Sequence, residues 1–364
     1  MAARPIGNED LRHIVASTSG LWDELRGERL FLTGGTGFFG SWLLESFCYA
    51  NRELKLGTEV TVLSRAPEKF VAKAPHIAND SAVKLVRGDV RDFEYPTGEF
   101  RFVIHAATEA SAKQIAEAPL DMLSTILAGT ERTLEFAAQC GARKFLLTSS
   151  GAVYGKQPSE ITHLPETYAG APDPLDPASV YAEGKRTSEL MCALYQKAAS
   201  ARGVEFEAKI ARCWAFCGPH LPLDTHFAIG NFVGDVLAGR PIAIGGDGTP
   251  RRSYLYASDL VVWLWTMLFR APALVPINVG SGRDVSIREL AEVVAKTLAP
   301  GTEVRVAKEA VAGAAPARYV PDVKRAEELL GLRETVSLEE AIRRTAEWHS
   351  PRRQPDTVLR LEKR

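Results

Sequence analysis

Short apolar runs alternate with segments of helical periodicity through the first two thirds of the chain. Hydrophobic runs bounded by polar turns predict buried strands at 30–33, 59–65, 83–87, 102–108, 144–150 and 207–213. Between them, apolar residues recur with the spacing of a helix face, most clearly at 41–52, 121–140 and 179–199. Strands that alternate with helices predict a parallel sheet with right-handed crossovers. We therefore predict an α/β fold with a doubly wound parallel sheet.

The pattern also predicts how the chain is divided. Residues 1–27 carry apolar positions on one helical face and are predicted to form a helical lead-in on the outside of the sheet. Residues 28–218 hold the alternating pattern and are predicted to form the main domain. Prolines and glycines then separate short elements, so 219–350 are predicted to form mostly a smaller C-terminal lobe, interleaved with the sheet. The charged, proline-containing stretch 351–364 is predicted to be a loose tail.

Composition adds little beyond an ordinary globular protein. Of 364 residues, 46% are hydrophobic and 24% charged, and 44 basic against 45 acidic residues give a net charge of -1. This balance favours neither a nucleic-acid nor a membrane partner. The five cysteines are scattered and complete no zinc pattern, so we expect reduced thiols, no metal site and a cytoplasmic location. We also expect no export signal and no membrane span, because the longest apolar run is short.

Four glycines follow the first predicted strand and precede the first predicted helix. Gly35, Gly37 and Gly40 fit the pattern G-x-G-x-x-G, whose glycines permit a tight turn, close approach of a pyrophosphate and close packing of helix on strand. The following helix would direct its positive dipole end at the phosphates. The setting predicts a Rossmann-like NAD(P) site, with cofactor contacts at Gly34, Gly37, Phe38, Phe39 and Gly40.

The ends of the next strands are predicted to complete the cofactor site. The second strand ends in Ser64 and Arg65 with no carboxylate, and an arginine here can accept a 2′-phosphate. We therefore expect NADP, with NAD as the alternative, in which case Arg65 is a solvated loop charge. Asp89 follows the third strand and could reach the adenine or cap the next turn. The other contacts predicted at these strand ends are Val90, Ala106, Ala107 and Thr108.

A hydroxyl, a phenol and an ammonium group occur in the order that a redox site requires. Ser150 ends the fifth strand, at the sheet edge where ligands bind in open α/β folds. Tyr181 and Lys185 are four residues apart and share one face of the next long helix. A nearby ammonium favours the phenolate, so Lys185 is expected to lower the pKa of Tyr181. Tyr181 could then move the proton of a sugar hydroxyl while Ser150 holds the same oxygen.

The chain resembles extended short-chain dehydrogenases/reductases of the NAD(P)-dependent epimerase/dehydratase type, which act on nucleotide sugars. The resemblance covers roughly residues 28–350, and the matching motifs lie at 33–40, 88–90, 105–107, 149–155, 181–185, 218–219, 246–249, 252–259 and 278–280. It implies that Ser150, Tyr181 and Lys185 are catalytic, with Lys185 also on the nicotinamide ribose. It further implies a homodimer and a nucleotide-diphosphate sugar partner, with substrate contacts at Ser150, Gly151, Asn231, Phe232 and Arg252. The Arg252 guanidinium also matches the geometry of a diphosphate.

The chain departs from this family at positions that touch the substrate. Gly151 and Ala152 stand where members that dehydrate or decarboxylate often carry Asp or Glu, which argues against a 4,6-dehydratase. Glu109 is the nearby carboxylate that could replace them. Ala215 stands where relatives often have Asn, so the sugar pocket is expected to differ.

These features predict hydride transfer at a sugar carbon, C4 by preference. An epimerase would retain its cofactor, whereas a 4-ketoreductase would exchange NADPH, and the motifs leave both open. One alternative is a 4,6-dehydratase or decarboxylase with a relocated carboxylate. Another, from a different class, is a non-catalytic NADP-binding sensor or scaffold.

Overall fold

A parallel sheet forms the centre of the computed structural model, which describes residues 2–108, 112–224 and 227–350. Within these residues the sheet has seven strands in the order β11-β6-β5-β4-β1-β2-β3. The strands are β1 (Arg29–Thr33), β2 (Glu59–Ser64), β3 (Val83–Arg87), β4 (Phe102–His105), β5 (Lys144–Ser150), β6 (Glu207–Cys213) and β11 (Pro276–Val279). All neighbouring pairs are parallel. The predicted doubly wound α/β fold is confirmed.

The strand order places a crevice at the middle of the sheet. The chain runs outward from β1 to β2 and β3, then returns to β4 on the other side of β1. The loops after β1 and β4 therefore leave in opposite directions, and such a switch point is where open α/β sheets bind ligands. The glycine turn follows β1, and Ala106 to Thr108 follow β4.

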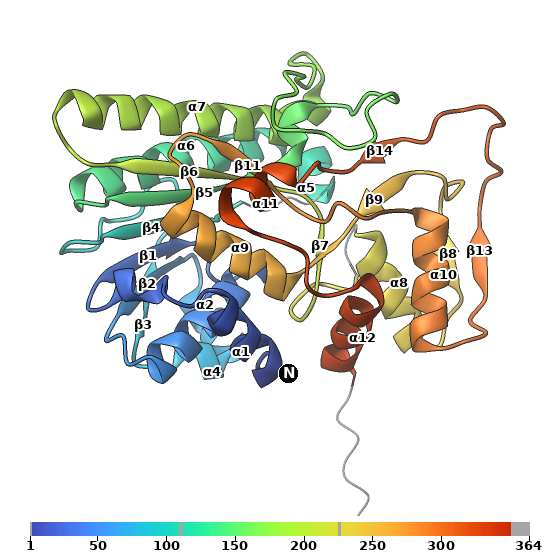
Figure 1. Ribbon diagram of the computed structural model, residues 1–364, viewed down its shortest axis with the longest axis horizontal. Helices are drawn as coiled ribbons and strands as arrows, with labels where there is room; N and C mark the ends of the chain where they lie inside the picture. The colour runs from blue at the N-terminus through green and yellow to red at the C-terminus, as the bar shows by residue number, and fades with distance from the viewer. Residues whose placement is uncertain (1, 109–111, 225–226, 351–364) are drawn as a thin grey trace, which may run out of the picture.

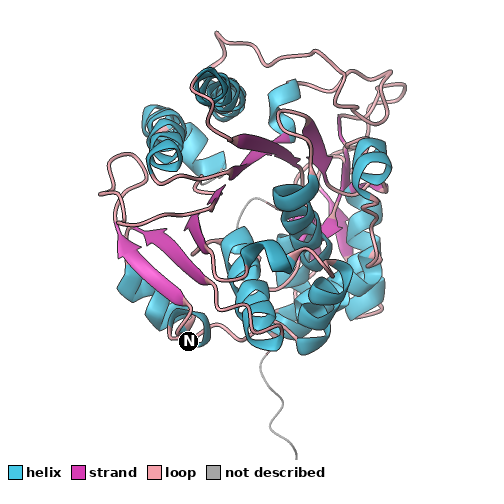
Figure 2. Ribbon diagram, turned by 60° about the vertical axis from the view of Figure 1, so that its left-hand side comes forward, coloured by secondary structure: helices cyan, strands magenta, loops and turns pink. Residues whose placement is uncertain are grey.

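Helices cover both faces of the sheet (Figures 1 and 2). On one face, α6 (Pro119–Gln139) and α7 (Val180–Ala201) lie side by side. On the other, α2 (Phe38–Glu53) packs beside α9 (Ala257–Arg270). The residues of α9 are buried almost without exception, as its continuous apolar sequence requires. The remaining α-helices are α1 (Asn8–Ser17), α3 (Pro67–Lys73), α4 (Pro75–Ala78), α5 (Ala112–Glu117), α8 (Ala228–Leu237), α10 (Ile287–Leu298), α11 (Lys324–Leu330) and α12 (Leu338–His349).

Several predicted bounds shift at the ligand edge of the sheet. The strands expected at 83–87, 144–150 and 207–213 have the predicted bounds. The first helix begins at Phe38 rather than at 41, because it starts directly on the glycine turn. The strands expected to reach 65 and 108 end at Ser64 and His105, since the chain turns away where the sheet meets the cavity described below.

The C-terminal part of the chain contributes both to the main sheet and to three small sheets. Strand β11 lies beside β6 at the edge of the main sheet. The small sheets pair β7 (Phe216–Cys217) with β10 (Leu255–Tyr256), β9 (Arg251–Ser253) with β12 (Asp284–Ser286) and β14 (Arg318–Tyr319), and β8 (Ile242–Ile244) with β13 (Val304–Val306). The domain bounds given above stay predictions, and the expected tail at 351–364 lies outside the described residues.

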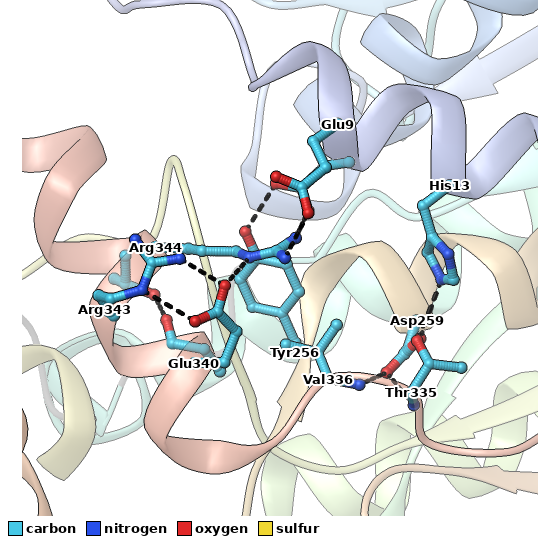
Figure 3. A network of polar contacts seen from close by, with 12 residues as sticks. Glu9, His13, Tyr256, Asp259, Thr335, Val336, Glu340, Arg343 and Arg344 are labelled. Atoms are coloured by element: carbon cyan, nitrogen blue, oxygen red, sulfur yellow. Dashed lines mark hydrogen bonds and ion pairs between the residues drawn. The ribbon is translucent and has the colours of Figure 1, made fainter.

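Polar contacts tie the N-terminal helix α1 to the C-terminal part, and Figure 3 shows those of Glu9 with Arg344 and of His13 with Asp259. Asp10 accepts hydrogen bonds from Tyr256 at 2.8 Å and from Arg344 at 2.5 Å. Nearby, Asp259 accepts a hydrogen bond from the backbone N–H of Thr335 at 2.8 Å. The lead-in segment is therefore part of the folded core, packed on α2 and α9. Among the described residues, we find no helix whose length and apolar character suit a membrane crossing.

Candidate functional site

A cavity of about 870 Å³ runs along the carboxyl ends of the central strands. It begins at the glycine turn after β1 and extends to Arg252 and Tyr319 in the C-terminal part. The predicted site residues that line it are Gly34, Gly37, Phe38, Phe39, Ser64, Arg65, Asp89, Val90, Ala106, Ala107, Thr108, Ser150, Tyr181, Lys185 and Arg252. One continuous space thus joins the predicted cofactor and catalytic residues.

The glycine turn has the geometry of a phosphate cradle. Gly34 has φ of 74°, and a Cβ there would lie 2.3 Å from the carbonyl oxygen of Ala106. Gly37 is the N-cap of α2 and makes no side-chain capping bond, so the helix start keeps its free N–H donors beside the cavity. These features fit a dinucleotide diphosphate. Gly40 does not line the cavity, and its role is packing, because a Cβ there would lie 2.3 Å from the backbone of Gly35.

The part of the cavity at the ends of β2 and β3 presents cations rather than a free carboxylate. Arg65 is exposed and lines the cavity directly after buried Ser64. Arg87 donates a hydrogen bond to the Arg65 carbonyl at 3.2 Å. Asp89 is held by the Arg91 guanidinium at 2.8 and 2.9 Å, and these hydrogen bonds keep its pKa below the usual value. The carboxylate of Asp89 is thus already neutralised by a protein partner.

The three predicted catalytic residues meet at the opposite end. Ser150 ends β5, and Tyr181 and Lys185 project from the first turns of α7 into the same cavity. The Lys185 ammonium donates to the Thr148 carbonyl at 2.8 Å and contacts the Thr108 hydroxyl at 3.0 Å. Only 2% of Lys185 is exposed, and this burial lowers its pKa to about 8.

The pKa of Tyr181 differs from the expectation. Burial raises the pKa of Tyr181 to about 12, and interaction with the Ser150 hydroxyl only partly opposes this effect. The expected lowering by Lys185 is not seen, because the ammonium is turned toward Thr148 and Thr108 and lies 5.9 Å from the centre of the phenol ring. Tyr181 is therefore a neutral phenol near pH 7, able to donate a proton.

Two aromatic residues beside Ser150 were not among the sequence predictions. Trp214, directly after β6, lines the cavity, and its place at a carboxyl strand end was an available signal. Tyr319 on β14 also lines it and interacts with the Ser150 hydroxyl, while burial raises the Tyr319 pKa. Nothing local in the sequence marks Tyr319, because β14 is two residues long and has no periodic pattern.

Some predicted substrate residues are not brought to the cavity. Gly151 is covered by Trp214, since a Cβ at residue 151 would lie 2.6 Å from the indole. Asn231 is exposed on α8 and Phe232 is packed in the hydrophobic core, so α8 meets the cavity through Ala228 instead. A role for Asn231 and Phe232 in substrate binding stays a prediction that this cavity does not support.

Carboxylates are scarce in the cavity. Of its described lining residues, Asp89 is the sole carboxylate, and it lies at the Arg65 end, away from Ser150. Ala152 lines the wall near Ser150 where some family members carry an acid. Glu109, the predicted replacement, lies outside the described residues.

Comparisons with known proteins give a matching family and similar sequences. The profile of the NAD dependent epimerase/dehydratase family matches residues 30–280. UDP-glucuronic acid decarboxylase 1 of Arabidopsis thaliana is 33% identical over 316 residues, covering 87% of this chain and 68% of that protein. UDP-glucuronic acid decarboxylase 1 of Xenopus tropicalis is 31% identical over 321 residues, covering 88% of this chain and 72% of that protein.

Solved structures show the same fold. DesIV, a dTDP-glucose 4,6-dehydratase from Streptomyces venezuelae whose crystal holds NAD, has a TM-score of 0.72 and 25% identity, over 88% of this chain and 96% of that one. The UDP-glucose 4-epimerase of Thermotoga maritima has a TM-score of 0.71 at 23% identity, over 88% of this chain and 98% of that one, and at that identity shows the fold alone.

Proposed function

The chain belongs to the NAD-dependent epimerase/dehydratase family, and on that premise we propose that it transfers hydride between a nicotinamide cofactor and C4 of a nucleotide-linked sugar. The observation that carries this proposal is the convergence of Ser150, Tyr181 and Lys185 on one cavity with the glycine turn. The same convergence makes a non-catalytic sensor the weaker reading, because sensing a nucleotide requires no buried phenol and ammonium.

Each of the three residues has a chemical role that its contacts support. The bound nicotinamide would supply or accept hydride at the sugar carbon. Ser150 holds the sugar oxygen by a hydrogen bond, and the neutral Tyr181 phenol gives that oxygen a proton during reduction or takes it back during oxidation. Lys185 is fixed by Thr148 and Thr108, and its ammonium, 5.9 Å from the centre of the Tyr181 ring, would hold the nicotinamide ribose.

We propose NADP as the preferred dinucleotide and ketone reduction as the preferred outcome. Arg65 provides positive charge where a 2′-phosphate would lie, whereas Arg87 is paired with Glu68 and Asp89 is occupied by Arg91. An exchangeable NADPH suits a 4-ketoreductase. A retained NAD would instead suit a 4-epimerase, which oxidises and re-reduces the same carbon.

Decarboxylation of a nucleotide hexuronate is a second candidate, favoured by the names of the relatives at 31–33% identity. Its first step is also oxidation at C4, which converts the sugar acid to a β-keto acid. Loss of carbon dioxide from such an acid requires less protein assistance than elimination of water. The scarcity of carboxylates among the described lining residues therefore argues more strongly against a dehydratase than against a decarboxylase.

Product analysis separates these functions. The purified protein is incubated with NADPH and a nucleotide 4-keto sugar, with a nucleotide hexose and NAD, and with UDP-glucuronic acid and NAD, and the products are identified by mass spectrometry and NMR. Reduction of the first substrate supports the ketoreductase, inversion at C4 of the second the epimerase, and release of carbon dioxide from the third the decarboxylase. If none of the three is converted, the proposed function is wrong.

We also propose that the protein pairs through α6 and α7. Leu190 and Leu194 on α7 are 58% and 55% exposed, and Leu120 on α6 is 81% exposed. Exposed apolar side chains on two neighbouring long helices suit a two-fold helix pairing. Light scattering of the native protein tests this, and a monomer at micromolar concentration contradicts it.

A further inference from the structure

A carboxylate on α7 lies one helical turn beyond the two predicted catalytic residues of that helix. Tyr181, Lys185 and Glu189 follow one another at intervals of four residues, so their side chains leave α7 on the same side. Glu189 does not line the cavity that holds Tyr181 and Lys185, and its side chain is 13% exposed. It lines a smaller cavity that α7, β6 and β11 border. Any effect of Glu189 on a ligand in the first cavity must therefore pass through other residues.

Glu189 joins α7 to the ends of two strands. The Ser149 hydroxyl donates a hydrogen bond to the Glu189 carboxylate at 2.5 Å, and the Arg212 guanidinium donates two more at 2.7 and 3.0 Å. Ser149 on β5 and Arg212 on β6 are partners in the register of the sheet. Ser149 directly precedes Ser150. One carboxylate thus ties the catalytic helix to the end of the strand that carries Ser150.

The Arg212 guanidinium is also held from its other side. It lies 4.7 Å from the centre of the Tyr154 ring, and the Tyr154 hydroxyl donates a hydrogen bond to Asn278 Oδ1 at 2.9 Å. The Arg212 side chain is 15% exposed, so both charges of the pair with Glu189 lie largely out of water. Such a two-bond pair fixes one geometry, because moving either partner would leave a charge buried without compensation.

Few of the groups around Lys185 and Glu189 are charged near neutral pH. The described titratable groups that face either residue are Tyr181 and Cys192 on α7, His105 on β4, Arg212 and Cys213 on β6, and Tyr154 after β5. Burial raises the pKa values of the phenols and thiols among them and lowers the pKa of the imidazole, so these groups are uncharged near pH 8.

The carboxylate of Glu189 is therefore well placed to act on the Lys185 ammonium. Burial lowers the pKa of Lys185 to about 8, and the charge of Glu189 opposes that shift. Helix α6 meets this part of α7 through the uncharged residues Ile126 and Thr130. Glu183 and Arg186 line the smaller cavity with Glu189, but they are more exposed and pair with each other at 3.9 Å.

We propose, on the premise of the hydride transfer above, that Glu189 is a positioning residue of the catalytic site. Its carboxylate fixes α7 to the ends of β5 and β6, and it places a negative charge one helical turn from the Lys185 ammonium. Ser149 and Arg212 hold the carboxylate in place. Lys185 consequently stays in register with Ser150 and keeps its charge to higher pH than burial alone would allow.

Titration of Lys185 tests the charge without turnover. NMR of the native protein, isotope-labelled at the lysine Cε, follows the ammonium, and Lys185→Arg assigns its signal. Glu189→Gln is expected to lower the midpoint by at least about half a pH unit, whereas Arg212→Gln leaves the carboxylate unpaired and is expected to raise it. Glu205→Gln, exposed and at the other end of β6, controls for net charge and should not move it. Midpoints that shift in the same direction, or not at all, in folded variants overturn the proposal.

Ser149→Ala tests the positioning role, because it removes one bond to Glu189 and keeps both charges. The Lys185 midpoint should stay, while kcat with NADPH and a nucleotide 4-keto sugar falls by about three- to tenfold. Ser200→Ala, exposed near the end of α7, is expected to retain kcat. An unchanged kcat in Ser149→Ala overturns the positioning role even if the charge variants do not fold. If the Lys185 midpoints shift as expected but the unaltered protein converts no 4-keto sugar, the proposed function fails and the coupling of Glu189 to Lys185 is supported.

Discussion

The indole of Trp214 occupies the space that a side chain at residue 151 would need, because a Cβ on Gly151 would lie 2.6 Å from the ring carbons. This contact explains in physical terms why the chain has glycine directly after Ser150. It also means that a carboxylate could not be placed at residue 151 without moving Trp214. The position of Trp214 and the lack of an acidic side chain at residue 151 therefore have the same steric cause.

Gly151→Ala is expected to destabilise the protein. The added methyl group forces Trp214 or β5 to shift, and overpacking of this kind costs about 1–3 kcal/mol in the free energy of unfolding. Urea denaturation measures the change. Gly245→Ala serves as the control, since no atom lies within 4 Å of a Cβ at that site. Equal stability of Gly151→Ala and Gly245→Ala would show that the contact with Trp214 is not close.

Tyr181→Phe is expected to lower kcat by about 10²–10⁴-fold, because the proton that passes between Tyr181 and the sugar oxygen no longer has a carrier. Tyr195→Phe removes a phenol from the same helix at a position outside the cavity and is expected to retain activity. Steady-state rates with NADPH and a 4-keto sugar provide the measurement. Comparable rates for the two variants would remove Tyr181 from the mechanism.

The pH dependence of reduction is expected to follow Lys185. Its pKa is lowered by burial to about 8, so the ammonium is present below this pH and is lost as the pH rises through it. With this charge lost from the nicotinamide side of the site, kcat/KM should fall above about pH 8. Lys185→Arg keeps its charge to far higher pH and is expected to be slower but without the fall. A fall at the same pH in Lys185→Arg would assign it to another group.

Arg65→Asp is expected to reverse the dinucleotide preference. The change removes the cation for a 2′-phosphate and adds a carboxylate that can bond a ribose 2′-hydroxyl, so the ratio of kcat/KM for NADPH over NADH should drop by at least about tenfold. Arg52→Asp, at an exposed arginine outside the cavity, controls for the change in net charge. If both variants keep the ratio of the unaltered protein, Arg65 does not select the cofactor.

Arg344→Ala is expected to be strongly destabilising. Burial raises the pKa of Asp10, while Tyr256 and Arg344 oppose this shift, so removal of Arg344 leaves a buried carboxylate poorly compensated. Breaking such a pair costs about 3–5 kcal/mol in the free energy of unfolding. Arg343→Ala, on the same helix but 46% exposed, should cost less than about 1 kcal/mol. Equal unfolding midpoints for the two variants would contradict the importance of the α1 contact.

The predicted site residues that the structure brings to the cavity are those with a local signal. The glycine turn follows a recognisable strand and Ser150 ends another, and Tyr181 and Lys185 share a face through helical spacing alone. Trp214 and Tyr319 are brought together by tertiary packing across two sheets, which no local pattern records.

The remaining differences also have physical causes. The resemblance to the family predicted that Asn231 contacts the substrate, but it could not predict which face of the helix the residue occupies. In the structure, Asn231 lies on the solvent-exposed face of α8. Lys185 was expected to lower the pKa of Tyr181, whereas burial raises it. Depth and orientation come from the packed structure and not from the spacing of residues.

Transfer of a labelled hydride tests the central claim most directly. The protein is incubated with a nucleotide 4-keto sugar and NADPH that carries deuterium at the transferable position, and the product sugar is examined by NMR. We expect deuterium at C4 of the sugar, and none in the product of Tyr181→Phe over the same period. A sugar product without deuterium at C4 would contradict hydride transfer from the cofactor to that carbon.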